Sequence, residues 1–436
     1  MAEHATRERW TNWGRSAESH PVRTVHPTST ADVVATVREA VSAGLPVKAI
    51  GASHSFTTIG ATDGVLLRLD RMTAIVAIDV TTRRVRVQAG ISLHDLNPLL
   101  RGRGLALPNL GDVDPQSVAG AISTGTHGTG GRLFGISAAV VAVQLVTAAG
   151  DVLEIDEQHP WFGAARVTLG ALGIVTEVTL QCVPAFLLHA REEPMALPAV
   201  MEQLPSLVDD NDHFEFYWFP HTTRTLTKRN NRVPEGTARR PLGRVRRWVD
   251  DELLSNTAFE GINRVVARRR SWIPRVNGVA ASVLSAREFV DDSFEVFVSS
   301  RDVRFREAEF AMPREALPHV LGELAAWFGA GHENISFPIE VRFTAADDVW
   351  MSTGHERDNC YVAVHQYWRS DYRAYFAAAQ DIFTAHEGRP HWGKLHTLDA
   401  GYFARRYARF DDFVAVRDEL DPGRTFSNAY LDRVLG

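Results

Sequence analysis

Two glycine-rich turns each carry a histidine among small hydroxyl residues. Residues 48–57 read KAIGASHSFT and residues 117–130 read SVAGAISTGTHGTG, so His54 and His127 lie beside glycine, serine and threonine. Backbone N–H groups and hydroxyls in such turns suit close approach to a phosphate or a flat ring system. The alternative is a pair of tight turns between packed elements, and spacing by itself leaves both interpretations open.

A carboxylate and a guanidinium lie two residues apart in the stretch 337–343, FPIEVRF. Strand alternation sends its apolar residues to one face and puts Glu340 and Arg342 together on the other. In the next apolar run, 360–367, the same alternation projects His365 from one face. If the two runs pair, the three groups suit oxidation of a hydroxyl carbon, with one of them accepting the hydroxyl proton. A surface ion pair is the alternative.

Two further patterns are excluded by their context. Residues 388–395, GRPHWGKL, have the spacing of a phosphate loop, but they follow a helix pattern and end in Leu395 where serine or threonine is needed. His386 and His391 are separated by a Gly-Arg-Pro break, which ends the helix that a zinc motif of this kind requires. We therefore expect neither a nucleotide hydrolase nor a bound metal.

Composition and charge argue against nucleic acid as a partner. The chain has 436 residues, 45% of them hydrophobic, and a net charge of -6, so it lacks the global basic field that holds nucleic acid. Two basic stretches, 239–248 and 268–275, are interpreted as solvated faces, because acidic residues follow the first at 250–252. We expect no nucleic-acid partner.

The sequence also indicates in which cellular compartment we expect the protein. Cys182 and Cys360 each lie in an apolar run and far apart, which favours buried thiols in a reducing compartment over a disulfide. No eighteen apolar residues run together and the first residues mix charges, so we expect no integral membrane segment and no export signal. Cytoplasm is the expected location.

The elements that must position these residues follow from periodicity and caps. Residues 27–44 predict a helix that begins at Ser29 or Thr30, and 92–104 predict a shorter one. Alternating apolar runs predict strands at 45–52, 65–70, 83–90, 138–156 and 171–183. Asp114 and Pro115 have the residue types of an N-cap and first helical position, which predicts a short helix of small residues behind them. The character changes near 186, so we expect one domain over 1–185 and a second after it.

Five motifs, taken in order, resemble those of a known family. They are the two glycine-rich stretches, FPIEVRF, HWGKLH at 391–396 and the ending 421–436, DPGRTFSNAYLDRVLG. Together they are similar to the aldonolactone oxidoreductases of the vanillyl-alcohol-oxidase class of flavoproteins, with alditol oxidases as close relatives. The resemblance implies an α+β fold, with an FAD-binding domain at 1–185 and a substrate domain at 186–436. That second domain has an antiparallel sheet with flanking helices, and its segment 388–436 returns to the flavin.

The resemblance implies that FAD is bound, with His54 joined covalently to the 8α-methyl of the flavin. Neutral imidazole is a nucleophile at neutral pH, which suits this bond. A simple hydrogen bond from His54 is the alternative, and Ser53 stands where many relatives have glycine. The other implied cofactor-binding residues are Gly51, Ala52, Ser53, Ser55, Phe56, Ser117, Gly120, Gly125, His127, Gly128, Val175 and Lys394.

The same resemblance assigns Glu340, Arg342, His365 and Lys394 to catalysis. Lys394 matches a lysine near the flavin N1 and C2 carbonyl, where a fixed cation stabilises the negative charge that follows hydride transfer to N5. Either Glu340 or His365 is left as the base.

The activity that this implies is oxidation of a sugar-derived 1,4-lactone of the L-gulono or D-arabinono type, with oxygen or an external acceptor taking the electrons. The first alternative is an alditol oxidase that acts on a polyol such as xylitol and produces hydrogen peroxide. A second is a flavoprotein that binds ligands without catalysis.

Overall fold

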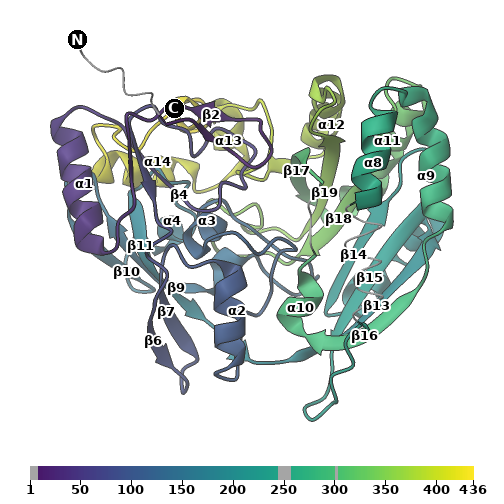
Figure 1. The fold of residues 1–436 in the computed structure, drawn as a ribbon, viewed down its shortest axis with the longest axis horizontal. Coiled ribbons are helices and arrows are strands. Elements are labelled where there is room, and N and C mark those ends of the chain that lie inside the picture. Colours follow the sequence, from purple (N-terminus) through teal and green to yellow (C-terminus); the bar gives the residue numbers. More distant parts are fainter. Residues whose placement is uncertain (1–7, 244–256, 300–302) are drawn as a thin grey trace.

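The structure is a computed structural model that describes residues 8–243, 257–299 and 303–436. Figure 1 shows two halves side by side, the left one built from the start of the chain and the right one from its middle. Part of the basic stretch 239–248 and the acidic residues at 250–252 lie outside the described residues. Among the helices of the described ranges, none is long and apolar enough to cross a membrane.

The helix α1 (Thr30–Ser42) confirms the prediction for residues 27–44. Ser29 is its N-cap: the Ser29 hydroxyl accepts from the backbone N–H of Asp32, and the Asp32 carboxylate accepts from the backbone N–H of Ser29. This reciprocal pair satisfies N–H groups that the first turn leaves without partners. Val33 and Val37, one turn apart, are fully buried against the first half.

Two sheets make up most of the first half. A parallel sheet has the order β3 (Arg23–Val25), β5 (Val65–Arg68), β4 (Val47–Ile50). An antiparallel sheet has the order β10 (Val152–Asp156), β9 (Val140–Val146), β11 (Ile174–Gln181), β7 (Arg84–Gln88), β6 (Ile75–Asp79). The other elements before residue 186, apart from α1 and α3 (Val118–Ser123), are short: β1 (Trp10–Thr11), β2 (Glu18–Ser19), α2 (Leu93–Arg101), β8 (Leu105–Ala106), η1 (Ile136–Ala139), α4 (Phe162–Ala165) and β12 (Val183–Pro184).

The short helix of small residues, α3 (Val118–Ser123), begins later than predicted. Its N-cap is Ser117, whose hydroxyl accepts from the N–H of Gly120, so the prediction of Asp114 and Pro115 as cap and first residue was wrong. Asp114 instead bonds His94 of α2, with 2.7 Å between a carboxylate oxygen and Nδ1. The carboxylate is therefore held by a neighbouring helix and is not available as a cap.

The second half is built on one eight-stranded sheet. Its order is β16 (Arg287–Asp292), β13 (Leu187–Ala196), β15 (Arg224–Arg232), β14 (His213–Trp218), β18 (Ile339–Thr344), β19 (Asn359–Tyr367), β17 (Phe305–Pro313), β20 (Arg389–Pro390). Every neighbouring pair is antiparallel. The two predicted strands 337–343 and 360–367 are direct neighbours, with Glu340 opposite Ala363 and Arg342 opposite Tyr361.

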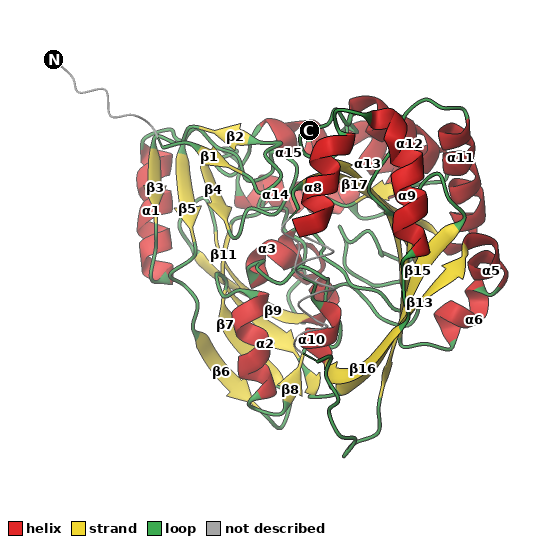
Figure 2. Ribbon diagram, turned by 45° about the vertical axis from the view of Figure 1, so that its right-hand side comes forward, coloured by secondary structure: helices red, strands yellow, loops and turns green. Residues whose placement is uncertain are grey.

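One face of this sheet is apolar and covered by helices. Val341, Phe343 and Val362 are fully buried in a core shared with α11 (Leu317–Gly329) and α12 (Arg373–Ala385). Figure 2 shows α5 (Leu197–Glu202), α6 (Leu204–Asp209) and α11 together at the outer side of the sheet. The remaining elements of this half are α8 (Phe259–Val266), η3 (Arg270–Trp272), α9 (Ile273–Ser282), α10 (Ser293–Phe297) and η4 (Arg314–Ala316). The opposite face of the central strands carries charged residues.

The end of the chain packs on the first half. After β20 come α13 (Ala400–Arg406), α14 (Phe410–Leu420) and α15 (Ala429–Leu435), and Figure 1 shows α13 and α14 in yellow within the left half. Trp392, Phe413 and Phe426 are fully buried in the same core as α1 and the first-half sheets. Lys48 Nζ donates to the carbonyl of Phe426 over 2.9 Å. The α+β class is confirmed, and the boundary between 185 and 186 stays a prediction.

Candidate active site

Two adjoining cavities run through the part of the molecule where the glycine-rich turns lie. The wide cavity has a volume of about 1140 Å³, and its walls include Trp13, Asp112, His127, Arg342 and Lys394. The narrow cavity has a volume of about 120 Å³ and is lined by small residues of the first half. Four residues line both cavities: His54, Ser55, Gln116 and Thr124. A ligand that fills both must therefore pass His54.

The narrow cavity depends on close contact between the turn at 51–55 and the start of α3. A Cβ on Gly51 would lie 2.0 Å from Oγ of Ser117, and one on Gly120 would lie 3.0 Å from the same oxygen. A side chain at residue 51 therefore does not fit. The predicted residues on this wall are Gly51, Ala52, Ser53, Ser55, Ser117, Gly120 and Val175.

Ser53 adopts the left-handed backbone conformation, with φ of 60°, that glycine takes most easily. Two contacts hold it there. The indole Nε1 of Trp10 donates to Oγ of Ser53 over 3.1 Å, and the backbone N–H of Trp13 donates to the Ser53 carbonyl over 2.9 Å. The serine side chain is thus accommodated in a backbone conformation that glycine takes most easily.

His54 follows Ser53 and faces the junction of the two cavities. Its ring stacks on Trp13 with 5.6 Å between ring centroids and 26° between planes. Burial, and then the charge of Lys394, lower the pKa of His54 to about 4. The imidazole is therefore neutral at neutral pH.

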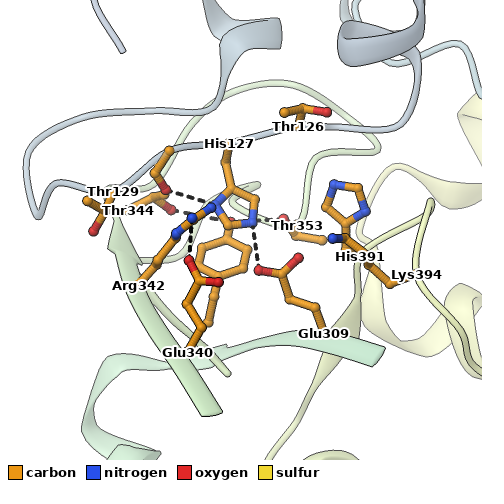
Figure 3. Close-up of polar contacts among 12 residues, drawn as sticks. Thr126, His127, Thr129, Glu309, Glu340, Arg342, Thr344, Thr353, His391 and Lys394 are labelled. Carbon is orange, nitrogen blue, oxygen red and sulfur yellow. Dashed lines mark hydrogen bonds and ion pairs between the residues drawn. The ribbon is translucent and has the colours of Figure 1, made fainter. Parts of the chain in front are cut away.

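The second glycine-rich turn lies against the charged face of the large sheet. The N–H of Gly130 donates to the carbonyl of Phe343 in β18 over 2.7 Å. Figure 3 shows His127 and Glu309 pointing toward each other, with 3.3 Å between Nε2 of His127 and a carboxylate oxygen of Glu309. The His127 ring also stacks on Tyr361, with ring centroids 3.7 Å apart.

Glu340 and Arg342 form an ion pair on β18, as Figure 3 shows. Arg342 also contacts Asp112 from the first half and Glu215 from β14, each at 3.1 Å. Burial disfavours the charged guanidinium, but the three carboxylates outweigh it and raise the pKa of Arg342 well above its usual value. Tyr217 donates to Glu340 over 3.1 Å. Arg342 is thus a permanent cation with a fixed direction.

Lys394 lies on the wall of the wide cavity and forms an ion pair with Glu307. Burial disfavours its charge, but Glu307 and then Glu309 outweigh that effect and raise the pKa of Lys394. His365 lies 3.6 Å from Glu307, and its Nδ1 lies 3.2 Å from the carbonyl of Pro338. The imidazole is 3% exposed and packs against Phe305 and other aromatic residues.

The structure brings most of the predicted site residues to these cavities. His54, Ser55, Phe56, His127, Arg342 and Lys394 line the wide one. Four others, all within the described ranges, line neither: Gly125, Gly128, Glu340 and His365. Glu340 reaches the site through Arg342, and His365 reaches it through Glu307. Gly128 serves packing, since a Cβ there would lie 2.1 Å from the carbonyl oxygen of Leu110.

Sequence reasoning missed four carboxylates around the two cations: the buried Glu215, Glu307 and Glu309 and the partly buried Asp112. A signal for three of them was present. Residues 305–313, FREAEFAMP, alternate like 337–343 and put Glu307 and Glu309 on one strand face. Glu215 lies in a similar alternating run, 213–218, HFEFYW, whereas Asp112 carries no comparable local signal.

The fold is similar to that of cholesterol oxidases of known structure. A cholesterol oxidase from Brevibacterium sterolicum superposes with a TM-score of 0.77 at 16% identity, covering 99% of this chain and 97% of that one. A solvent-stable cholesterol oxidase superposes with a TM-score of 0.76 at 18% identity, covering 99% and 98%. At this level of identity the likeness shows the shared architecture alone.

Residues 21–156 match the FAD binding domain family. This range contains both glycine-rich turns. The side chains fit such a cofactor. The wall of the narrow cavity has glycines where a Cβ would clash, together with small hydroxyl residues. The wide cavity has a lysine and an arginine that are held by ion pairs. The expected FAD-binding domain is confirmed.

Full-length relatives agree with the sequence resemblance. An L-gulono-1,4-lactone dehydrogenase from Mycobacterium tuberculosis is 42% identical over 98% of this chain and 99% of its own length. An L-gulonolactone oxidase from Bos taurus is 34% identical over 97% of both chains, and an alditol oxidase from a Streptomyces species is 31% identical over 98% of both. Residues 178–434 match the family described as D-arabinono-1,4-lactone oxidase. Since this match spans more than half of the chain and the relatives cover nearly all of it, the chain belongs to the D-arabinono-1,4-lactone oxidase family.

Proposed function

We propose that this protein oxidises a sugar-derived 1,4-lactone of the L-gulono or D-arabinono type at a secondary hydroxyl beside the lactone carbonyl. A bound FAD would supply the hydride acceptor, and oxygen or another acceptor would take the electrons. One observation supports this most: the buried Arg342 and the partly buried Lys394, both cations, line the same cavity as His54 and His127 of the glycine-rich turns. The full-length relatives supply the substrate class.

Arg342 is proposed to bind an oxygen of the lactone. A guanidinium offers several N–H donors in one plane, and three carboxylates hold this one in place. Its fixed direction orients the reacting carbon before the reaction begins. The negative charge that develops during hydride transfer is stabilised by the ammonium of Lys394.

Glu340 is proposed to orient Arg342 and, through that guanidinium, to act on the bound lactone more strongly than His365 does. Neither Glu340 nor His365, both among the described residues, lines the wide or the narrow cavity. Glu340 contacts Arg342 directly, whereas His365 lies behind Glu307 and is packed among aromatic rings. We expect Glu340→Gln to slow flavin reduction by about 100-fold or more, and His365→Gln to have a much smaller effect. Stopped-flow reduction with one lactone measures both, and a reversed order of effects would show that His365 acts on the lactone more strongly.

We propose that His54 carries a covalent flavin. Its neutral imidazole at the junction of the cavities supports this, because the neutral form is the nucleophile. Acid precipitation of the purified protein should leave the yellow colour in the pellet, and His54→Ala should release it into the supernatant. Colour released from the unsubstituted protein would show that His54 only contacts the cofactor.

The substrate class is tested by anaerobic reduction, read as loss of the flavin absorbance. We expect L-gulono-1,4-lactone or D-arabinono-1,4-lactone to bleach the protein and xylitol to leave it oxidised. The alditol oxidase among the relatives makes the polyol the second candidate, so bleaching by xylitol alone would replace the proposal. A yellow protein that no lactone or polyol reduces would point to binding without catalysis.

We keep the cytoplasm as the proposed location. Cys182 and Cys360 are both free and buried, and burial raises the pKa of each thiol to about 12, so neither is a reactive or paired group. Free thiols of this kind suit a reducing compartment. The proposed partners are a lactone and an electron acceptor.

A further inference from the structure

Two buried glutamates on β17 face the wide cavity and have no part in the proposed reaction. Glu307 and Glu309 are each 5% exposed and line the cavity next to Lys394. Strand alternation puts both on the face that carries Glu340 and Arg342, since Glu309 lies opposite Ala363 and Ala363 lies opposite Glu340. Burying a carboxylate without a partner costs free energy. The groups that pair with Glu307 and Glu309 therefore indicate the role of these two residues.

Glu307 holds the segment that carries Lys394 at two points. Its backbone carbonyl accepts from the N–H of Leu395 over 2.9 Å, and its carboxylate pairs with the Lys394 ammonium. The neighbouring carbonyl of Glu309 accepts from the N–H of His391, also over 2.9 Å. The turn 391–395 is therefore bound to β17 on both sides of the lysine, and the ammonium can swing away only by breaking its ion pair with the buried carboxylate of Glu307.

The ion pair between Glu307 and Lys394 also weakens the positive electrostatic field in the cavity. Lys394 alone would present a full positive charge to a ligand in the cavity, but Glu307 contacts it and Glu309 acts on it as well. In a site of low effective dielectric, an adjacent opposite charge cancels much of that field. Burial disfavours the ionised form of Glu307, yet Lys394 and His365 outweigh it and lower its pKa to about 2, so the carboxylate is ionised at neutral pH.

We infer that Glu307 is a positioning residue that directs the Lys394 ammonium into the wide cavity and limits its effective charge, and that it thereby sets the reduction potential of the bound flavin. This inference rests on the proposed function, because it requires FAD in that cavity. Reduction adds negative charge to the flavin, so a stronger positive field favours the reduced form.

The test compares three variants of the FAD-loaded protein: Glu307→Gln, which removes the negative charge at similar size, Glu307→Asp, which keeps it, and Lys394→Gln, which removes the cation. The midpoint potential is measured by dye-coupled reduction, and the affinity for sulfite, which adds to flavin N5, is measured by absorbance titration. Neither readout requires turnover of a sugar.

We expect Glu307→Gln to raise the equilibrium ratio of reduced to oxidised flavin by about tenfold, equivalent to about 30 mV for a two-electron couple. Sulfite should bind more tightly to this variant. Lys394→Gln should shift both quantities in the opposite direction, and Glu307→Asp should stay near the unsubstituted protein. Opposite signs separate a charge effect from general disturbance of the fold, which would move both neutral variants the same way.

Two outcomes would overturn the inference: an unchanged potential in Glu307→Gln, or shifts of the same sign in Glu307→Gln and Lys394→Gln. If the unsubstituted protein binds no FAD, or binds it and is reduced by no lactone or polyol, the proposed function fails instead. If Glu307→Gln does not fold, Glu307→Ala, which also removes the negative charge, takes its place. The inference then requires a raised potential in Glu307→Ala and a lowered one in Lys394→Gln.

Discussion

Arg342 is the buried guanidinium on which three carboxylates converge, and replacing it by methionine isolates what its charge contributes. The side chain of Arg342 is 9% exposed, and those of Glu340, Glu215 and Asp112 are 6%, 11% and 14% exposed. Removing one partner of a buried ion pair costs about 3–5 kcal/mol, because the remaining charge is left without compensation. We expect Arg342→Met to lower the free energy of unfolding by about this amount at pH 7.5.

The loss of unfolding free energy in Arg342→Met should depend on pH, and the protonation of the carboxylates determines whether it grows or shrinks. In the unsubstituted protein, burial disfavours ionised Glu215, but Lys228 and Arg342 outweigh burial and lower its pKa. Its contribution to stability is therefore present above the unfolded pKa of about 4.3 and is lost as pH falls through the folded value. Without Arg342, Glu215 keeps only Lys228 against the effect of burial, and Glu340 and Asp112 lose their ion pairs with the guanidinium. We therefore expect the folded variant to bind protons more tightly than the unsubstituted protein. Between pH 7.5 and 5.5 the deficit should shrink by up to about 1.4 kcal/mol per pH unit for each carboxylate that protonates.

Urea unfolding followed by tryptophan fluorescence at pH 7.5 and 5.5 measures this deficit. A matched control is Arg373→Met, because the Arg373 side chain is 78% exposed and its ion pair with Asp371 lies in solvent. The control should leave the midpoint unchanged at both values of pH. A deficit for Arg342→Met below about 1 kcal/mol, or one of equal size at both values of pH, would refute the view that three ionised carboxylates depend on this cation.

Three other predictions concern the cofactor loop and the end of the chain. Because the pKa of His54 is about 4, covalent incorporation of FAD should be equally complete at pH 8 and pH 6, as measured by in-gel flavin fluorescence; a sharp loss near pH 6.5 would contradict the lowered pKa. Gly51→Ala should abolish retention of FAD, read at 450 nm, because its Cβ would lie 2.0 Å from Oγ of Ser117, and adding Ser117→Ala should recover part of it; full retention in the single variant would show that the backbone yields. Phe426→Ala should lower the free energy of unfolding by about 3–5 kcal/mol in urea titrations, because Phe426 is fully buried in the core that joins the end of the chain to the first half; a loss near zero would mean that this contact carries little stability.

Local features of the sequence predicted most of the longer elements of the first half and the strands β18 and β19 of the second. The capping pair of Ser29 and Asp32 and the apolar stripe behind it specify α1, since a helix start depends on residues within one turn. The alternation in FPIEVRF placed Glu340 and Arg342 on one face for the same kind of reason. The start of α3 was misplaced because Asp114 and Ser117 are both good caps, and only the contact of Asp114 with His94 decides between them.

By itself, the sequence determined which side chains share a strand face, which turns need glycine and, through its ordered motifs, the family. The tertiary structure decided what surrounds those side chains. Glu215 lies 127 positions before Arg342 in the chain, yet the two are 3.1 Å apart, because the order of strands in the sheet makes β14 and β18 neighbours. Periodicity acts over a few residues and states nothing about strand order, so neither the carboxylates around Arg342 nor the pairing of Lys394 with Glu307 was visible before the chain was folded.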